Sequence, residues 1–100
     1  MTSSATQPAA TETRPQMTVT ARFFALYREA AGQDQLVVTV PEGTTVGGLW
    51  QYLRDAAPGL ASAEAATAYT AYAVNGAWAK NSRVLAGGDE VAFLPPVSGG

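Results

Sequence analysis

Hydrophobic and polar residues alternate in the first segment of the chain that carries large apolar side chains. Over residues 17–26 the apolar positions of one face are Met17, Val19, Ala21 and Phe23. The opposite face is polar at first and becomes apolar at Phe24 and Leu26. A period of two residues predicts a β-strand with one face in the core. The same period predicts a second strand over residues 34–40, which ends at the Pro-Glu-Gly sequence 41–43.

The spacing of apolar residues changes to a helical one after the second strand. The residues at positions i, i+3, i+4 and i+7 of this segment are Val46, Leu49, Trp50 and Leu53. Thr44 or Thr45 can cap this helix, and Pro58-Gly59 is expected to end it. Residues 60–67 are rich in alanine and are interpreted as a loop that can hold a short helix. One helical turn, ended by Gly32, is expected over 27–32.

Three further strands are expected in the last third of the chain, over residues 69–74, 77–80 and 90–94. Asn75-Gly76 is typical of a type I′ hairpin turn, because both central positions of that turn need a positive φ. The helix is long enough to serve as a crossover, so the last strand can lie parallel to the first. The pattern predicts an α+β protein of the β-grasp (ubiquitin-like) fold, with a mixed sheet of about five strands packed on one main helix.

The chain divides into three segments on this interpretation. Residues 1–16 carry no large apolar side chain after Met1 and are expected to form a disordered tail. Residues 17–94 form the β-grasp domain. Residues 95–100 form an extended carboxyl-terminal tail that ends in Gly-Gly.

The composition excludes several classes of function. The net charge is −2 and Lys and Arg together number 6, so a nucleic-acid partner has no electrostatic support. The sequence has no Cys and no His, which removes thiolate chemistry and the commonest general base and metal ligand. No run is long enough to span a bilayer, and no secretory signal is present. We therefore expect a cytoplasmic protein that is not an enzyme by itself and binds no metal, nucleic acid or membrane.

The carboxyl terminus, EVAFLPPVSGG from Glu90 onward, combines the stiffest and the most flexible residues. Pro95 and Pro96 favour an extended start and reduce the entropy lost on insertion into a partner. Gly99 and Gly100 have no side chain, so they can thread a channel too narrow for other residues. Residues 95–100 reach roughly 20 Å when extended. The only reactive group at the tip is the terminal carboxylate.

Three stretches resemble one known family. They are RFFALYREAAG from Arg22, VNG from Val74 and GDEVAFLPPVSGG from Gly88, and the resemblance covers residues 17–100. The sequence is similar to the small subunit of molybdopterin synthase, in the ubiquitin-like sulfur-carrier (MoaD/ThiS) family. Two features depart modestly from that family: Ala86-Gly87 intrudes before Gly88-Asp89, and the helix carries Gly47 and Gly48.

This resemblance implies a function for the terminal carboxylate. In the family, an E1-like adenylyltransferase uses ATP to adenylate the terminal glycine, here Gly100, and a sulfurtransferase supplies sulfur indirectly to form a thiocarboxylate. The thiocarboxylate enters the large catalytic subunit and donates sulfur to cyclic pyranopterin monophosphate. The family's heterotetramer, two small and two large subunits, is implied in the same way. No cofactor is expected to bind stably.

An apolar patch on the sheet face away from the helix is expected to dock these partners. A sheet covered on one side by a helix should be polar on the other, so Phe24, Leu94 and Trp78 on that face suggest an interface. The expected partner-binding residues are Phe24, Trp78, Leu94, Pro95, Pro96, Val97 and Ser98. We expect Trp78→Ala to weaken partner binding with little loss of stability. The alternatives are a satellite cluster closed by the loop 60–68 and simple crowding of apolar residues at an edge of the sheet.

Three other functions are compatible with the sequence. The chain can carry sulfur for thiamine thiazole or another metabolite. It can be a ubiquitin-like protein modifier whose Gly100 carboxylate forms isopeptide bonds to lysines. It can also be a binding module with an inert tail.

Overall fold

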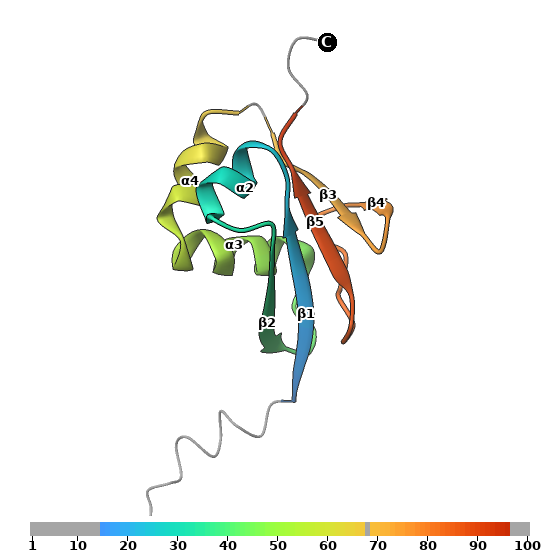
Figure 1. Cartoon of the computed structure of the whole chain (residues 1–100). Helices are drawn as coiled ribbons and strands as arrows, with labels where there is room; N and C mark the ends of the chain where they lie inside the picture. The colour runs from blue at the N-terminus through green and yellow to red at the C-terminus, as the bar shows by residue number, and fades with distance from the viewer. Residues whose placement is uncertain (1–14, 68, 97–100) are drawn as a thin grey trace, which may run out of the picture.

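The computed structural model describes residues 15–67 and 69–96. Along these residues the elements are β1 (Gln16–Phe23), α2 (Leu26–Ala31), β2 (Gln35–Pro41), α3 (Val46–Ala56), α4 (Pro58–Ala65), β3 (Ala71–Val74), β4 (Ala77–Ala79) and β5 (Glu90–Leu94). The strands form one five-stranded sheet in the order β2-β1-β5-β3-β4 (Figure 1). None of these helices is long and apolar enough to cross a membrane.

The two central strands run in parallel, as the sequence predicts. β1 pairs antiparallel with β2 and parallel with β5, with Thr20 opposite Glu90 and Phe23 opposite Phe93. β3 pairs antiparallel with both β5 and β4. The mixed sheet and its helices confirm the α+β, β-grasp expectation. β1 includes Gln16, which we expected in the tail, while residues 1–14 lie outside the described part of the chain.

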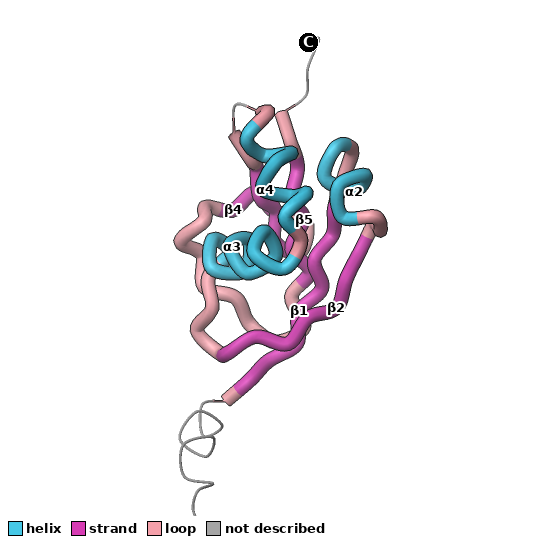
Figure 2. The backbone as a smooth tube through the Cα atoms, turned by 90° about the vertical axis from the view of Figure 1, so that its left-hand side faces the viewer, coloured by secondary structure: helices cyan, strands magenta, loops and turns pink. Residues whose placement is uncertain are grey.

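The core lies between the sheet and the helices, which cover one face of it (Figure 2). The predicted inward residues of β1 are all buried, as are the four predicted residues of α3. The Trp50 indole stacks on the Phe93 ring with centroids 4.5 Å apart, and the Tyr27 ring lies 5.1 Å from Trp50. Aromatic packing of this kind adds to the hydrophobic gain from burial. It joins α2 and α3 to the centre of the sheet.

The amino terminus of α3 explains why a glycine stands at position 47. The Thr45 hydroxyl accepts a hydrogen bond from the Gly48 N–H, so Thr45 is the capping residue. The carbonyl of Asn81 accepts a bond from the Gly47 N–H, which brings the loop before β5 close to the helix. A Cβ at position 47 would lie 3.2 Å from the Asn81 carbonyl oxygen and from its Cβ. The glycine therefore permits close contact between loop and helix, at the usual cost in helix propensity.

The alanine-rich segment after α3 is itself a helix, α4. α3 ends at Ala56, just before Pro58 as expected, and Pro58 is also the first residue of α4. Proline is favourable at the first position of a helix because that N–H has no partner within the helix. Leu60 and Ala63 of α4 are buried. The alanines of α4 are spread around the helix, so its sequence shows no clear apolar stripe. The sequence left residues 60–67 as a loop with a possible short helix, and the structure has the helix, over Pro58–Ala65.

A polar network anchors α4 and the connection that follows it. The Glu64 carboxylate accepts hydrogen bonds from Trp50 Nε1 at 2.6 Å and Thr70 Oγ1 at 2.6 Å. Arg54 Nη1 donates to the other carboxylate oxygen at 2.9 Å. Burial raises the pKa of Glu64, but the hydrogen bonds from Thr70 and Trp50, together with the Arg54 charge, outweigh burial and lower it. The network fixes the start of β3 to the helical layer.

Asp89 and Asn75 connect the β3–β4 turn to the start of β5. Asn75 and Gly76 both have positive φ, of 52° and 84°, as the predicted type I′ turn requires. The Asp89 carboxylate accepts from the Ala86 N–H at 2.8 Å and from Asn75 Nδ2 at 2.9 Å. The Asn75 side-chain oxygen accepts from the Glu90 N–H at 2.9 Å. The Asp89 side chain is buried, and its hydrogen bonds stabilise the fold.

We expect Asp89→Asn to reduce the free energy of unfolding by about 1–3 kcal/mol at neutral pH. The new amide can keep one bond, but its NH2 group faces a donor, because the Asn75 oxygen is already bonded to Glu90. The Ala86 N–H and Asn75 hold the pKa of Asp89 below its ordinary value of 3.8. The Asp89 contribution is thus complete above that value and is lost as pH falls through the lower, folded-state pKa.

Urea unfolding of the two proteins at neutral and acidic pH measures this difference. The stability gap should narrow at acidic pH. A gap that stays constant with pH would contradict the role of the ionised carboxylate.

Candidate functional site: the stalk and the open face

The carboxyl-terminal tail, residues 95–100, begins at the end of an inner strand of the sheet. We also call this tail the stalk. β5 lies between β1 and β3, and it carries the chain to Pro95 and Pro96, which are half-buried. Because β1 and β5 are parallel, this exit is at the end of the sheet where β1 ends (Figure 1). The predicted site residues Val97, Ser98, Gly99 and Gly100 lie outside the described residues, and their roles stay predictions.

The face of the sheet away from the helices is partly apolar. One row of paired residues crosses all five strands on this face, and it consists of Gln35, Arg22, Ala92, Ala73 and Trp78. The next row includes Leu94 of β5, which pairs with Ala71 of β3. We call the surface formed by Arg22, Phe24, Ala71, Ala73, Trp78, Ala92 and Leu94 the open face. The small side chains of Ala71, Ala73 and Ala92 lie at its centre, and its larger side chains lie around them.

Trp78 and Leu94 lie on the open face as expected, but Phe24 reaches it differently. β1 ends at Phe23, and Ala25 has a φ of 53°, so the chain turns away from the strand direction. Phe24 and Leu26 therefore do not continue the strand, which corrects the predicted strand over 17–26. The Arg22 guanidinium carbon lies 5.5 Å from the Phe24 ring centroid, which places that ring beside the open face. Leu26 begins α2 instead.

The pattern of exposure separates the two tryptophans of the chain. Trp78 is 75% exposed, whereas Trp50 is 1% exposed. An exposed indole next to small residues is unusual for a side chain that only stabilises the fold. The alternative of a satellite cluster closed by the loop 60–68 does not apply to Trp78.

The sequence interpretation missed two exposed apolar residues near the stalk. Tyr69 is 60% exposed and lies two residues before Ala71, which pairs with Leu94. Leu26 is 40% exposed and follows the end of β1. Both lie at the end of the sheet where the stalk emerges. Their exposure depends on where β1 ends and β3 begins, and such boundaries are the least certain part of a sequence-based prediction.

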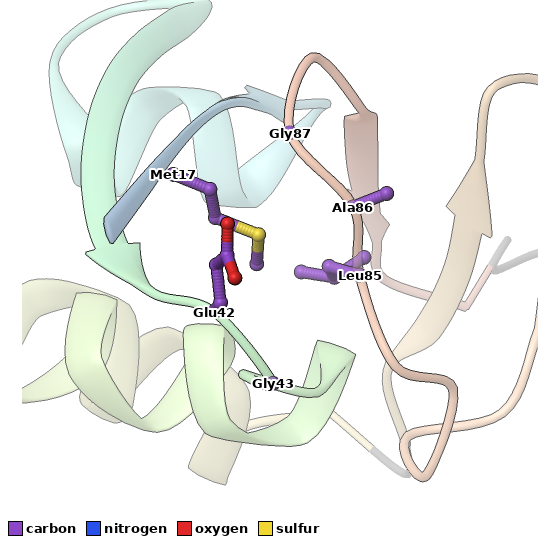
Figure 3. Close-up of a pocket in the computed structure, with 6 residues that line it drawn as sticks. All are labelled: Met17, Glu42, Gly43, Leu85, Ala86 and Gly87. Carbon is purple, nitrogen blue, oxygen red and sulfur yellow. The ribbon is translucent and has the colours of Figure 1, made fainter. Parts of the chain in front are cut away.

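A pocket at the other end of the sheet is not part of this site. It has a volume of about 300 Å³ and is lined by Met17, Glu42, Gly43, Leu85, Ala86 and Gly87. Figure 3 shows the side chains of Met17, Glu42 and Leu85 around it, from the start of β1, the turn after β2 and the loop before β5. Glu42 is its only ionisable side chain. The start of β1 is remote from the end of β5, so the pocket is far from the stalk.

A comparison with known protein families settles the relationship of this chain. Residues 21–100, which include the sheet from the middle of β1 onward and the tail, match the ThiS family. The chain belongs to the ThiS family. The likeness that the sequence motifs suggested is thereby confirmed.

Solved structures similar to this ThiS-family chain include modifiers and cofactor-synthesis proteins. SAMP1 of Haloferax volcanii is 34% identical with a TM-score of 0.73, and the match covers 83% of this chain and 99% of that one. A Pyrococcus furiosus protein named as molybdopterin converting factor, subunit 1, is 26% identical with a TM-score of 0.69, over 81% and 99% of the chains. The complex of subunits 1 and 2 of that factor from Helicobacter pylori matches at 24% identity and a TM-score of 0.56, over 84% and 100%.

Alanine substitutions at the two tryptophans of this ThiS-family chain should differ strongly in their effect on stability. Trp50→Ala removes a buried ring that contacts Tyr27 and Phe93, and we expect a loss of about 3–5 kcal/mol. Trp78→Ala removes an exposed ring, and we expect a change within about 0.5 kcal/mol. Thermal unfolding followed by circular dichroism measures both. A fall in melting temperature for Trp78→Ala that approaches the fall for Trp50→Ala would place Trp78 in the core.

Proposed function

We propose that this chain is a sulfur carrier in the synthesis of molybdopterin. Its terminal Gly100 carboxylate is converted to a thiocarboxylate, and the sulfur is donated in the active site of the large synthase subunit. The observation that carries the proposal is the membership of residues 21–100 in the ThiS family, together with a Gly-Gly tail that follows directly on the inner strand β5. The chain itself is the non-catalytic subunit of a sulfurtransferase.

The chemistry needs an activated acyl carbon and no side chain of the carrier. A free carboxyl terminus has a pKa of about 3.5, so it is an anion and a poor electrophile at neutral pH. A carboxylate oxygen attacks the α-phosphorus of ATP in an E1-like partner, and pyrophosphate leaves. A hydrosulfide ion then attacks the acyl carbon, AMP leaves with the C–O bond electrons, and loss of the S–H proton gives the thiocarboxylate. The resulting thiocarboxylate donates its sulfur to cyclic pyranopterin monophosphate, and two donations build the dithiolene.

The fold supports this role by presenting the tail from a fixed point. Pro95 and Pro96 restrict the start of the tail, and β5 is held on both sides by β1 and β3. Gly99 and Gly100 are suited to a narrow channel in each partner. A stalk fixed at its root loses less entropy when its tip is bound.

The open face supplies the surface that a partner covers while the tail is inserted. It lies beside the stalk exit and carries Trp78 and Leu94, and Pro95 and Pro96 continue from it. The relative named as molybdopterin converting factor, subunit 1, supports a large-subunit partner, and in the Helicobacter pylori structure subunit 1 is in complex with subunit 2. We place the large synthase subunit on the open face.

The intact mass of the protein isolated from its native host tests the proposal. We expect a species heavier than the carboxylate form by the difference between one sulfur and one oxygen atom. Tandem fragmentation should assign the extra mass to Gly100. A variant that lacks Gly100 is the matched control and should show only the unmodified mass. Native protein without the heavier species, in cells that are making molybdopterin, would contradict the proposal.

The large partner that co-purifies with the chain separates two kinds of sulfur carrier. Recovery of a molybdopterin synthase large subunit supports the proposal above. Recovery of a thiazole-forming enzyme in its place would assign the chain to thiamine synthesis, with the same chemistry at Gly100.

A second candidate function is protein modification. It is favoured by the 34% identity to SAMP1 of Haloferax volcanii, a small archaeal modifier protein. In this function a lysine amine of a target attacks the activated acyl carbon, AMP leaves, and an isopeptide bond forms. Lys80 is the only lysine of this chain, so linkage between copies is restricted to Lys80 and the amino terminus.

Denaturing gels of cells grown under sulfur starvation distinguish modification from sulfur transfer. The sulfur-carrier proposal predicts the free chain and no bands of higher mass. Bands that disappear when Gly100 is deleted would establish modification instead. A Lys80→Arg variant then identifies copies linked through Lys80, because it removes those bands and leaves copies linked through the amino terminus and conjugates to other proteins.

A further inference from the structure

Arg22 is the basic side chain among the residues that define the open face. It lies in β1 opposite Ala92 of β5, and the same row continues through Ala73 to Trp78. Its guanidinium carbon lies 5.5 Å from the Phe24 ring centroid, within the range of a cation–π contact. The Arg22 charge therefore lies between the apolar residues of the open face and the Glu90 carboxylate.

The hydrogen-bonding capacity of Arg22 is not used within the part of the chain that the structure describes. Its Nε atom is buried and has no hydrogen-bond partner there. Its Nη1 atom lies 3.6 Å from Glu90 Oε2, which is an ion pair but is too long for a hydrogen bond. Both side chains are partly exposed, at 37% for Arg22 and 48% for Glu90, so this pair contributes little to stability. The buried Nε cannot reach a partner protein, but the side chain is partly exposed, so the Nη groups at its end are the donors that a partner can use.

We propose that Arg22 is the polar anchor of the open face and receives the carboxylate of an Asp or Glu from the enzyme that takes up the tail. The inference rests on the proposed function, because it assumes that an enzyme partner covers this surface. A guanidinium presents a planar set of N–H donors that matches a carboxylate in two parallel hydrogen bonds. The Phe24 ring restricts the orientation of that plane. A partner acid and an apolar side chain over Ala73 and Ala92 would cover the open face together.

A carboxylate fits this position better than a phosphate or a nucleic acid. Arg22 has the Glu90 carboxylate beside it, and the whole chain has a net charge of −2. Nucleic-acid binding needs several basic groups that together release counterions. A single cation with a neighbouring acid instead favours one small anionic group held in a defined geometry.

The Arg22 charge also disfavours binding of proteins that lack an acid at the matching position. A protein that covers the open face without an acid at this place would bury the Arg22 charge and leave its donors unpaired. That desolvation is unfavourable, so the apolar residues of the open face alone do not decide which protein binds. Arg22 is therefore expected to determine specificity more than total affinity.

Binding of charge variants to the purified large synthase subunit tests the inference. Arg22→Glu should raise the Kd at least about tenfold, because it sets two carboxylates against each other. Arg22→Gln, which removes the charge and keeps a similar length, should raise it severalfold. Arg28→Glu is the matched control: it makes the same change of charge on α2, in the helical layer on the other face, and should change the Kd by less than about twofold. High salt should narrow the difference between wild type and Arg22→Glu.

Each outcome decides between the two claims. If the wild-type chain binds the large subunit and carries a thiocarboxylate, but both Arg22 variants bind within twofold of it, the Arg22 inference is wrong and the proposed function stands. If the wild-type chain does not bind the large subunit, both are wrong. If Arg22→Glu lowers the melting temperature, the milder Arg22→Gln decides, and an unchanged Kd for it overturns the inference.

Discussion

The parallel pairing of β1 with β5 is the constraint on which the remaining features depend. Parallel neighbours cannot be joined by a tight turn, so the chain must cross over, and the crossover carries α3 and α4 onto one face. Trp50 of α3 stacks on Phe93 of β5 at 4.5 Å, which joins the crossover to the strand that ends in the tail. As a consequence the stalk leaves from the centre of the sheet, next to the end of β1, and no helix of the described residues covers the other face.

This arrangement separates stability from recognition and from chemistry. Side chains that point toward the helices form the core. The partly buried Glu64 and the buried Asp89 accept hydrogen bonds that hold connecting segments in place. Side chains that point the other way, such as Arg22 and Trp78, are available to a partner. The proposed reaction uses the main chain's last acyl carbon. In the proposed function the partners supply the catalytic groups, so a protein without His or Cys can take part in the transfer.

The sequence predicted correctly those elements that have one buried face, because burial gives their apolar residues a regular spacing. It did not predict features that are set by contacts other than burial of one face. β1, β2 and α3 are periodic because one face of each is buried, and the Asn75-Gly76 turn has its own chemistry. α4 has no apolar stripe because alanine dominates it. The end of β1 at Phe23 depends on the turn at Ala25, which has a positive φ without being glycine. The hydrogen bonds that the Asp89 carboxylate accepts, and the lack of a hydrogen-bond partner for Arg22 Nε among the described residues, depend on the three-dimensional fold. No local sequence pattern reveals them.

The central claim is that the reactive group is the terminal acyl carbon on a slender stalk, and that the domain serves only to deliver it. The most direct measurement is molybdopterin production in cells that lack the wild-type gene and express a variant with Gly100→Phe. The account predicts no cofactor, because a bulky last residue cannot enter the partner's channel, although the domain stays folded. Full restoration of cofactor synthesis by this variant would contradict the account.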